Sequence, residues 1–249
     1  MKLSAFIPVH NEEKNLDDCL KSVAFADEIV VLLDKCTDSS KEIALRHNAK
    51  IVEGSWPTES MRRLVGVEAC TGDWIIDLDA DERVPTELAT EIRHTVNTSP
   101  FDLHPVPFDN YIGNKLVKYG WGAYIGVSQK VALYRKGAKS YTTRGITHGE
   151  AIINGRYGPA LQNAITHYLD DDLSDTFRRF DRYTTTRAKE LIEQNDRDGF
   201  GRNFIRFFSR FYKCYIRRQG YKEGSIGFLI ATLAGLYPIV SYIKAKYKI

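Results

Sequence analysis

A run of carboxylates, Asp77-Leu78-Asp79-Ala80-Asp81-Glu82, directly follows the apolar segment Trp74-Ile75-Ile76. A hard divalent cation prefers carboxylate oxygens, and a Mg²⁺ or Mn²⁺ ion that bridges two phosphates needs one or two of them. Because side chains alternate along a strand, Asp77, Asp79 and Asp81 are expected on one side of it. The run therefore predicts a metal site; the alternative is a solvated acidic turn that caps the following helix.

Two more polar segments follow apolar runs nearer the N-terminus. His10-Asn11-Glu12-Glu13 comes directly after Leu3–Val9, and Pro8 fixes the backbone before it. Such a strand end can hold a nucleotide base and ribose, although a helix cap made by Asn and Glu gives the same pattern. Asp34 ends the next apolar run, where its carboxylate can accept a hydrogen bond from a pyrimidine N–H. The polar residues just beyond it are expected to cap a helix.

Residues 2–98 alternate short apolar runs with amphipathic stretches, which is typical of repeated β-α units on a mostly parallel sheet. Strands are expected at Leu3–Val9, Glu28–Leu33, Lys50–Val52 and Trp74–Leu78. Helices are expected at Leu16–Phe25, Ser39–His47, Ser60–Ala69 and Thr86–Val96. Ligands of such sheets bind beyond the carboxyl ends of the strands, where the three polar segments lie.

Residues 99–200 are richer in aromatic and β-branched residues and have no clean helical period until residue 173. We expect strands near Val131–Tyr134 and Ala164–Tyr168, and loops that contain Tyr119–Gly122 and Arg144–Glu150. A long helix is expected over Leu173–Gln194, because Asp196–Gly199 then breaks the helical pattern.

Residues 201–249 form a basic tail that holds ten of the chain's 35 Lys and Arg residues but only one of its 32 acidic residues. On a helical wheel of about 100° per residue, the segment 202–216 and Arg217 place five basic residues in a stripe of roughly 80°, with aromatic residues opposite. Residues 225–243 are uncharged but contain Gly227, Gly235 and Pro238, which favours an interfacial or broken hairpin segment. We predict that the tail contacts an anionic membrane; alternatively, its aromatic face packs on the rest of the chain.

The composition is that of a folded globular protein, with 43% hydrophobic, 12% aromatic and 27% charged residues in a chain of 249. The cysteines lie at wide intervals without a C-x-x-C pair, so neither a zinc site nor a disulfide framework is indicated. Reduced thiols and an N-terminal apolar run too short for a signal peptide predict a cytoplasmic location. No helix-turn-helix or RNA-type aromatic motif is present, so nucleic acid is not an expected partner.

Taken in order, the polar segments resemble those of the family 2 glycosyltransferases, which have the fold called GT-A. The family pattern is roughly I-P-x-x-N-E-E, a strand that ends in D-x-S-T-D, R-N-x-G-x-x-x-A-x-G-D, and then D-x-D. In the third element Arg63 and Gly66 match, while Leu64 stands where the family has Asn. The resemblance implies an α/β chain with a mostly parallel central sheet flanked by helices, to which the tail adds a C-terminal amphipathic helical extension.

The likeness is greatest to the lipopolysaccharide-core β-glucosyltransferases and covers nearly the whole chain. It is carried by LDADERV at 78–84, Asn110-Tyr111, Tyr119-Gly120-Trp121-Gly122, Val131–Lys136, a His-Glu element and the pair His167-Tyr168. Two segments depart from that pattern. His148-Gly149-Glu150 stands where the family has adjacent His and Glu, and Ser60–Arg63 stands where it has Gln-Lys-Asn.

The resemblance implies a metal-dependent, inverting hexosyltransferase. It would move a hexose, glucose by the narrower likeness, from a UDP-linked nucleotide sugar to a saccharide acceptor of a lipid-linked glycan such as lipopolysaccharide core. Residues 1–98 would bind the nucleotide sugar, residues 99–200 would bind the acceptor, and residues 201–249 would associate with a membrane. The enzyme would be peripheral on the inner face of the cytoplasmic membrane, in contact with anionic lipid through residues 202–249.

The resemblance also assigns roles to individual residues. Asp81, together with Asp79, would hold Mg²⁺ or Mn²⁺. The residues assigned to the nucleotide sugar are Pro8, His10, Glu12, Asp34, Arg63 and Asp79. Arg63 is alternatively a surface salt-bridge residue.

An attacking hydroxyl needs a base within hydrogen-bond reach, and Glu150 and His148 are the candidates. The alternatives are that both residues only order their glycine-containing loop, or that an unrecognised acid is the base. Trp121 can stack on a sugar or pack in the core. His167 and Tyr168, which end an apolar run, are expected in the core.

Three rival functions are weighed against this one. A polyprenyl-phosphate sugar transferase would share the fold but use a lipid phosphate as acceptor. A sugar-nucleotide pyrophosphorylase would need an N-terminal glycine-rich phosphate loop, which the sequence lacks. A non-catalytic membrane-binding adaptor would use the basic tail alone.

Overall fold

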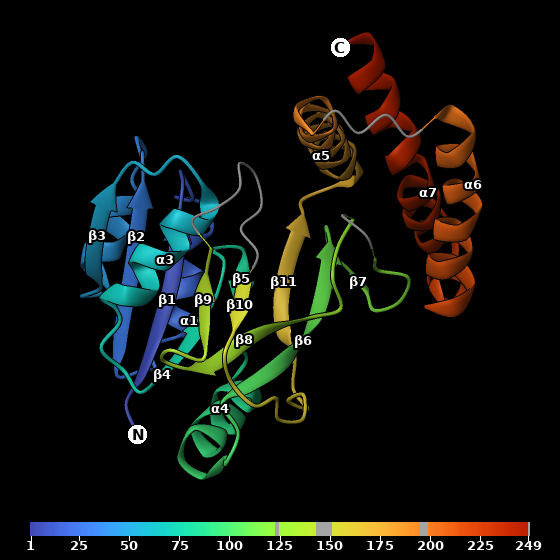
Figure 1. The fold of residues 1–249 in the computed structure, drawn as a ribbon. Helices are drawn as coiled ribbons and strands as arrows, with labels where there is room; N and C mark the ends of the chain where they lie inside the picture. Colours follow the sequence, from blue (N-terminus) through green and yellow to red (C-terminus); the bar gives the residue numbers. More distant parts are fainter. Residues whose placement is uncertain (123–124, 143–150, 195–198, 249) are drawn as a thin grey trace. The chain divides into compact units, whose positions relative to one another are not determined.

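The computed structural model describes residues 1–122, 125–142, 151–194 and 199–248 (Figure 1). The chain forms two compact units. Unit 1 consists of Met1–Phe108 and Gln129–His167, and unit 2 consists of Asp109–Ser128 and Tyr168–Ile249. These boundaries differ from the expected ones after residues 98 and 200, because two strands each run from one unit into the other. The division by function stays a prediction.

Four parallel strands form the N-terminal half of unit 1, as expected from the β-α pattern. In spatial order they are β3 (Lys50–Gly54), β2 (Glu28–Asp34), β1 (Leu3–Val9) and β4 (Trp74–Asp77). All seven residues of β1 are buried, because the strand is central and both of its faces are covered. The carboxyl ends of β1, β2 and β4 therefore meet at one edge of the sheet.

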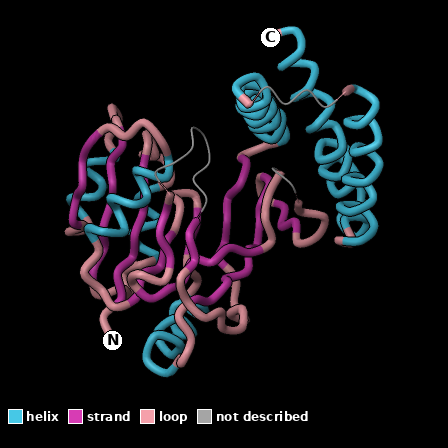
Figure 2. The backbone as a smooth tube through the Cα atoms, viewed as in Figure 1, coloured by secondary structure: helices cyan, strands magenta, loops and turns pink. Residues whose placement is uncertain are grey.

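Helices cover both faces of this sheet (Figure 2). The core on one face is built with α1 (Leu16–Ser22), α2 (Ser40–Arg46) and α4 (Thr86–Thr98). The core on the other face is built with α3 (Glu59–Ala69). Gly66 lets α3 approach β1 closely, since a Cβ added there would lie 2.0 Å from the ring of Phe6. The expected α/β class, with helices on both faces, is confirmed.

The remaining strands include antiparallel pairs, such as β4 with the strand Gln129–Arg135, so the whole sheet is mixed. Along the described part of the chain they are β5 (Glu82–Arg83), β6 (Leu103–Ile112), β7 (Lys115–Val117), β8 (Gln129–Arg135), β9 (Lys139–Tyr141), β10 (Ala151–Ile153) and β11 (Ile165–Asp170). The sheet order is β3-β2-β1-β4-β8-β6-β11-β5, with β7 on β6, and β9 pairs with β10 separately. The two strands expected in this region, β8 and β11, are confirmed.

The ten-residue strand β6 is absent from the sequence prediction. Its burial alternates along most of its length, as a strand's should, but it contains Pro105 and Pro107. Proline cannot donate a ladder hydrogen bond and normally argues against a strand inside a sheet. The structure accommodates the prolines with a register shift against β8 between His104 and Pro105.

Unit 2 is built mainly of helices. They are α5 (Leu173–Glu193), α6 (Phe200–Tyr212), a π-helical segment (Lys213–Arg217), a 3₁₀ turn (Gly220–Glu223) and α7 (Gly224–Tyr247). The helix expected over Leu173–Gln194 is confirmed. The broken hairpin expected in 225–243 is wrong, because α7 is continuous through Pro238. Its glycines allow close packing instead: a Cβ on Gly235 would lie 2.8 Å from the ring of Phe207.

The motif Tyr119-Gly120-Trp121-Gly122 belongs to the packing of unit 2. Gly120 has a φ of +86°, and a Cβ added to it would lie 2.9 Å from the Cα of Gly220. Trp121 is 3% exposed and its indole N–H donates to the carbonyl of Val117 at 2.6 Å. The structure therefore favours core packing, not sugar stacking, for Trp121.

Candidate active site

The carboxylate run lies on a turn at the carboxyl end of β4. The strand ends at Asp77, and the turn is closed by a hydrogen bond of 3.0 Å from the N–H of Glu82 to the carbonyl of Asp79. The chain then enters β5, which pairs antiparallel with β11 so that Glu82 faces His167. This pairing brings a histidine from far along the sequence to the acidic turn.

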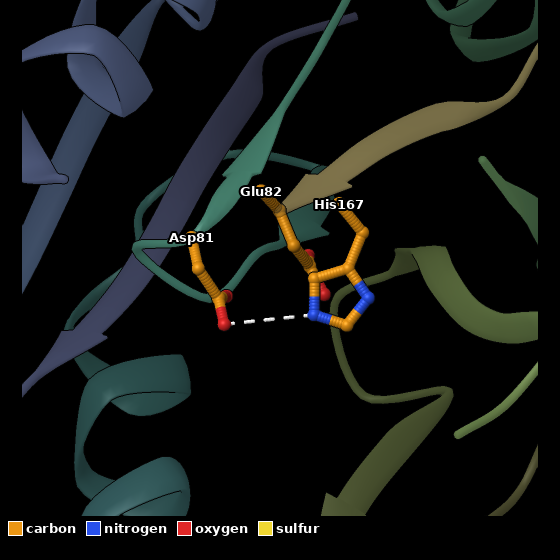
Figure 3. A group of neighbouring side chains, drawn as sticks. All are labelled: Asp81, Glu82 and His167. Atoms are coloured by element: carbon orange, nitrogen blue, oxygen red, sulfur yellow. Dashed lines mark ion pairs between the residues drawn. The ribbon is translucent and has the colours of Figure 1, made fainter. Parts of the chain in front are cut away.

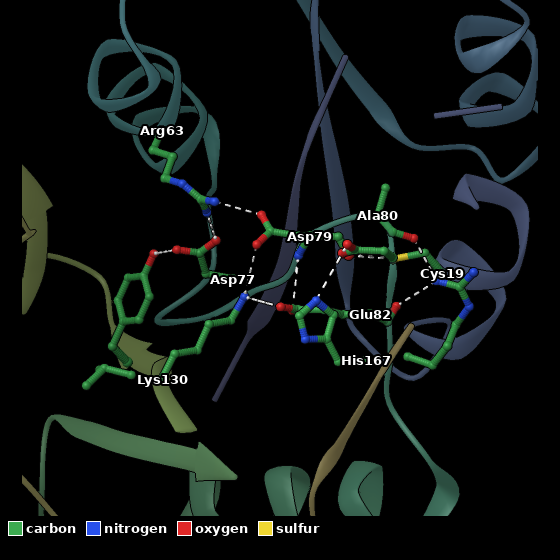
Figure 4. Close-up of polar contacts among 12 residues, drawn as sticks. Cys19, Arg63, Asp77, Asp79, Ala80, Glu82, Lys130 and His167 are labelled. Atoms are coloured by element: carbon green, nitrogen blue, oxygen red, sulfur yellow. Dashed lines mark hydrogen bonds and ion pairs between the residues drawn. The ribbon is translucent and has the colours of Figure 1, made fainter. Parts of the chain in front are cut away.

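Arg63, on α3, joins the first two aspartates (Figure 4). Its guanidinium donates to Asp77 Oδ1 at 2.9 Å and to Asp79 Oδ1 at 2.7 Å, and its side chain is 14% exposed. Asp77 Oδ2 accepts further hydrogen bonds from Tyr141 at 2.7 Å and Lys139 at 3.1 Å. Arg63 is thus an ion-pair residue, but an internal one and not the surface one considered from the sequence.

The charges around Asp77 and Asp79 keep both carboxyls ionised. Burial alone would raise the pKa of Asp77, but Lys139 and Arg63 hold it at about 2. Burial would likewise raise the pKa of Asp79, but Arg63 and Lys130 hold it well below its usual range. Asp77 has hydrogen-bond partners on both oxygens and is therefore expected to stabilise the fold, not to bind a ligand.

Lys130, on β8, holds the neighbouring Glu82. Its ammonium group donates to Oε1 and Oε2 of Glu82, both at 2.7 Å, and lies 3.6 Å from Asp79 Oδ2. Glu82 is almost fully buried, and burial raises its pKa to about 7 against the opposing charge of Lys130. Lys130 therefore offsets much of the negative charge of Glu82 and Asp79. It was not among the residues predicted from the sequence.

Asp81 points toward His167 (Figure 3). Asp81 Oδ2 lies 3.5 Å from His167 Nε2, whereas Asp81 Oδ1 is buried without a hydrogen-bond partner among the described residues. One ligand atom from each of Asp81, Glu82 and His167 lies within 4.8 Å of the others. Carboxylate oxygens with one imidazole nitrogen suit a divalent cation, and an unsatisfied buried oxygen is what such an ion would complete.

His167 was expected in the core, which is correct for the packing of its ring but not for its Nε2 atom. Its ring packs on Phe108 with centroids 5.1 Å apart, yet its Nε2 faces the acidic turn. Burial lowers the pKa of His167, but the hydrogen bond and charge of Asp81 outweigh burial and raise it. The signal that could have found this residue is the His-Tyr pair in the resemblance.

The expectation that Asp77, Asp79 and Asp81 share one side is wrong for the third residue. Alternation holds only while the chain is a strand, and β4 ends at Asp77. Asp77 and Asp79 both face Arg63, while Asp81 faces His167.

The loops after β1 and β2 are tied together. Asn11, at a φ of +57°, accepts the N–H of Thr37 at 2.7 Å, and Glu13 accepts the N–H of Ser39 at 3.1 Å. Asp38 accepts hydrogen bonds from the N–H groups of Glu13 and Ser40, at 2.9 and 3.1 Å. Asp38 therefore supports the start of α2, as expected, and also fixes the loop after β1.

The residues expected at the nucleotide are only partly brought together. Pro8 is buried inside β1, whereas His10 is exposed with its Nδ1 2.6 Å from the carbonyl oxygen of Asp34. Asp34 accepts the N–H of Trp56 at 3.1 Å and lies 3.7 Å from Arg62. Arg62 was not predicted, and its buried Nε has no hydrogen-bond partner among the described residues.

Glu12 is electrostatically linked to the acidic turn. Burial raises the pKa of Glu12, and the charges of Asp81 and Asp79 raise it further. Glu12 therefore adds to the local excess of negative charge that a cation would relieve. The candidate bases, Glu150 and His148, lie outside the described residues.

Comparisons with known proteins agree with the α/β fold. Residues 4–119 match the family model described as glycosyl transferase family 2. An uncharacterized glycosyltransferase of Rickettsia bellii is 26% identical over 92% of this chain and 80% of its own. The lipopolysaccharide core biosynthesis glycosyltransferase LpsC of Rhizobium meliloti is 22% identical over 98% and 92%. The crystal structure of S. aureus TarS 1-349 matches with a TM-score of 0.53 and 15% identity, over 100% of this chain and 91% of that one.

Proposed function

We propose, on the premise that this chain belongs to glycosyl transferase family 2 and has the GT-A fold, that it moves a hexose from a UDP-linked sugar to a saccharide acceptor with inversion. One observation carries the proposal: Asp81 Oδ1 is buried and has no hydrogen-bond partner among the described residues, beside His167. A buried, unpaired carboxylate oxygen is costly unless a ligand completes it.

Asp81 and His167 are the proposed holders of Mg²⁺ or Mn²⁺. When bound, the ion would neutralise the charge that develops on the leaving diphosphate. Asp79, the second metal ligand suggested by the sequence, has one oxygen on Arg63 and the other near Lys130. We therefore assign Asp79 and Arg63 to contacts with the nucleotide sugar, and Glu82 to the support of Asp81 and His167.

The proposed donor site is the edge formed by the ends of β1, β2 and β4. Asp34 would accept the pyrimidine N–H, which favours a uracil nucleotide, while His10 and Glu12 would contact the ribose side. The hydrogen bonds between the loops after β1 and β2 would hold these groups in place before the donor arrives. Glu150 or His148 is the proposed base that takes the proton of the acceptor hydroxyl.

The proposed acceptor is a lipid-linked glycan such as lipopolysaccharide core. The likeness to LpsC over nearly the whole chain supports this class of acceptor, and the narrower sequence resemblance supports glucose as the hexose. An acceptor in a membrane also suits the basic tail. The enzyme would be peripheral on the inner face of the cytoplasmic membrane, held to anionic lipid by residues 202–249.

A donor-hydrolysis screen tests the proposal directly. UDP-, GDP- and dTDP-hexoses are incubated with the protein and Mn²⁺ or Mg²⁺, and the released nucleotide diphosphate is measured. We expect turnover of a UDP-hexose that chelation abolishes and that Asp81→Ala loses. Asp102→Ala is the matched control, because Asp102 is also a partly buried aspartate of unit 1 but is hydrogen-bonded to the N–H of Arg156.

Two results would contradict the proposal. Turnover that persists in Asp81→Ala or under chelation would rule out the proposed metal site. The absence of turnover with every nucleotide sugar would favour a non-catalytic adaptor. Extraction of the transfer product separates the remaining rival, since a polyprenyl-phosphate sugar would be found in the lipid phase without a saccharide acceptor.

A further inference from the structure

The surface of α6 is divided into three faces. Asn203 is buried, and Phe207 and Phe211 are half-buried where α6 packs on α7. An apolar row is exposed beside them, formed by Phe204, Ile205, Phe208 and Tyr212. Basic residues are exposed on the third face, namely Arg202 and Arg206 of α6 and Lys213 directly after it. The aromatic residues predicted to share one face therefore divide between a packed face and an open one.

The exposure of this apolar row is unusually large for a contiguous group. Ile205 is 71% exposed, Tyr212 60% and Phe208 58%. The rings form a chain, with Phe204 and Phe208 at a centroid distance of 5.3 Å and Phe200 stacked 6.2 Å from Phe204. Single exposed apolar residues are ordinary on a protein surface, but a continuous row marks a binding surface.

The neighbouring helix α7 has the opposite character. Residues 220–247 are long and apolar enough to cross a membrane. Their most apolar 18-residue window has a mean hydropathy of 1.9, but half of that window is buried. Ile230, Ala231 and Ala234 are fully buried against the rest of unit 2, where α7 packs on α5 and α6 (Figure 1). If α7 moved into a bilayer, unit 2 would lose the core that these side chains form. By its packing, α7 is therefore the core helix of this unit.

We propose that α6, and not α7, is the membrane-contacting element, and that it lies in the plane of an anionic lipid surface. Phe204, Ile205, Phe208 and Tyr212 enter the boundary between headgroups and acyl chains, while the basic face contacts lipid phosphates. An amphipathic helix with aromatic residues beside a basic face has the chemistry of such an interface. The inference refines the membrane contact proposed above and is independent of the sugar-transfer reaction.

The charge of the region favours lipid over a second copy of the chain as the occupant. No acidic residue occurs in the sequence between residues 199 and 222, whereas this stretch holds seven Lys and Arg residues. Two such faces brought together would place like charges opposite each other, which opposes association. A surface of anionic headgroups would instead be complementary.

The test uses the full chain and a double substitution, Ile205→Gln with Phe208→Gln. Both side chains are exposed, so the folded unit should tolerate the change. Leu45→Gln with Tyr157→Gln is the matched control, because both residues are exposed apolar residues of unit 1. Binding is measured by co-sedimentation with vesicles of phosphatidylcholine alone or mixed with phosphatidylglycerol, at low and high salt.

We expect the wild type and the control to bind the phosphatidylglycerol vesicles at low salt, and the α6 variant to bind about tenfold or more weakly. Equal binding by the α6 variant, or no binding by the wild type, would overturn the proposal. The proposal would also be overturned if the wild type formed a concentration-dependent dimer that binds no vesicles and the α6 variant stayed monomeric. Hydrolysis of a soluble donor should be unchanged in the α6 variant, so failure of the membrane contact and failure of the proposed reaction are distinguishable.

Discussion

Each unit contains an aspartate beside a basic residue; Asp170 of unit 2 is buried, Asp81 of unit 1 is half-buried, and their hydrogen bonding differs. In unit 2, Asp170 accepts hydrogen bonds from Arg179 Nε at 2.8 Å and Nη2 at 2.7 Å, and from Thr176 at 2.7 Å. Arg179 also donates to the carbonyl of Ile125. In unit 1, Asp81 faces His167 at 3.5 Å with one oxygen, and its other oxygen is buried without a hydrogen-bond partner among the described residues.

The difference separates a group that holds the fold from a group that is built for a ligand. A buried charge whose hydrogen bonds are all made stabilises the structure around it, and losing one partner is costly. A buried oxygen that lacks a partner costs stability until a ligand supplies one. Asp77 has hydrogen-bond partners on both oxygens. It is therefore a structural group like Asp170, although it lies at the start of the acidic turn in the sequence.

Removing the basic partner in unit 2 should have the largest effect. Arg179→Met leaves Asp170 buried and unpaired, and we expect the free energy of unfolding to fall by about 3–5 kcal/mol. Denaturant unfolding followed by circular dichroism measures this. The matched control is Arg178→Met on the same helix, where an exposed pair with Asp175 predicts a change within about 0.5 kcal/mol. Equal effects of the two substitutions would contradict the view of Asp170–Arg179 as a stabilising pair.

Neutralising the aspartate in unit 1 should act on activity. Asp81→Asn removes the charge but keeps the shape, and we expect metal-dependent donor hydrolysis to fall by about two to three orders of magnitude, corresponding to about 2.7–4 kcal/mol in the transition state. Stability without metal should be unchanged or slightly higher, because a half-buried charge among other carboxylates is lost. A loss of stability as large as that of Arg179→Met would break the comparison between the two sites.

The histidine at the acidic turn should have a smaller effect on the same ion. His167→Ala removes one proposed metal contact, and we expect the affinity for Mn²⁺, measured by calorimetry, to fall by about 10–100-fold. His47→Ala serves as the control, since His47, directly after α2, forms a 2.8 Å pair with Asp17 of α1. Unchanged Mn²⁺ affinity in His167→Ala would assign this residue to packing alone.

An exposed pair completes the series with the smallest effect. Hydrogen bonds from Arg93 and from the backbone N–H of Leu3 lower the pKa of Asp27 to about 2, from 3.8. Because the folded pKa is the lower one, this stabilisation is complete above pH 4 and is lost as the pH falls toward 2. Asp27→Asn should cost under about 1 kcal/mol at pH 7, since the pair is partly exposed. The variant should also flatten the pH dependence of stability between pH 4 and 2, and an unchanged acid profile would contradict the assignment.

The first half of the fold could be predicted from the sequence almost residue by residue. Runs such as Leu3–Val9 and Trp74–Asp77 are set by local hydrophobicity, and the helices between them by amphipathic period and caps. The rule that ligands bind beyond the carboxyl ends of parallel strands then located Asp34 and the acidic turn on one edge. These features depend on residues that are neighbours along the chain, so the sequence contains the information.

The remaining features of the candidate site depended on contacts between segments that are distant in the sequence. His167 reaches Glu82 and Asp81 only because β11 pairs with β5, a register that no local pattern specifies. Arg63 takes its place between Asp77 and Asp79 because Gly66 lets α3 approach β1.

The tail shows the same division between what is local and what is not. The sequence determined that residues 201–249 are basic, aromatic and helical. Only the packing decided that α7 is the core of unit 2 and that Ile205 and Phe208 of α6 stay exposed. The hydrophobicity of a side chain determines that its transfer out of water is favourable. The surface against which it is buried is determined by the elements that fold against it.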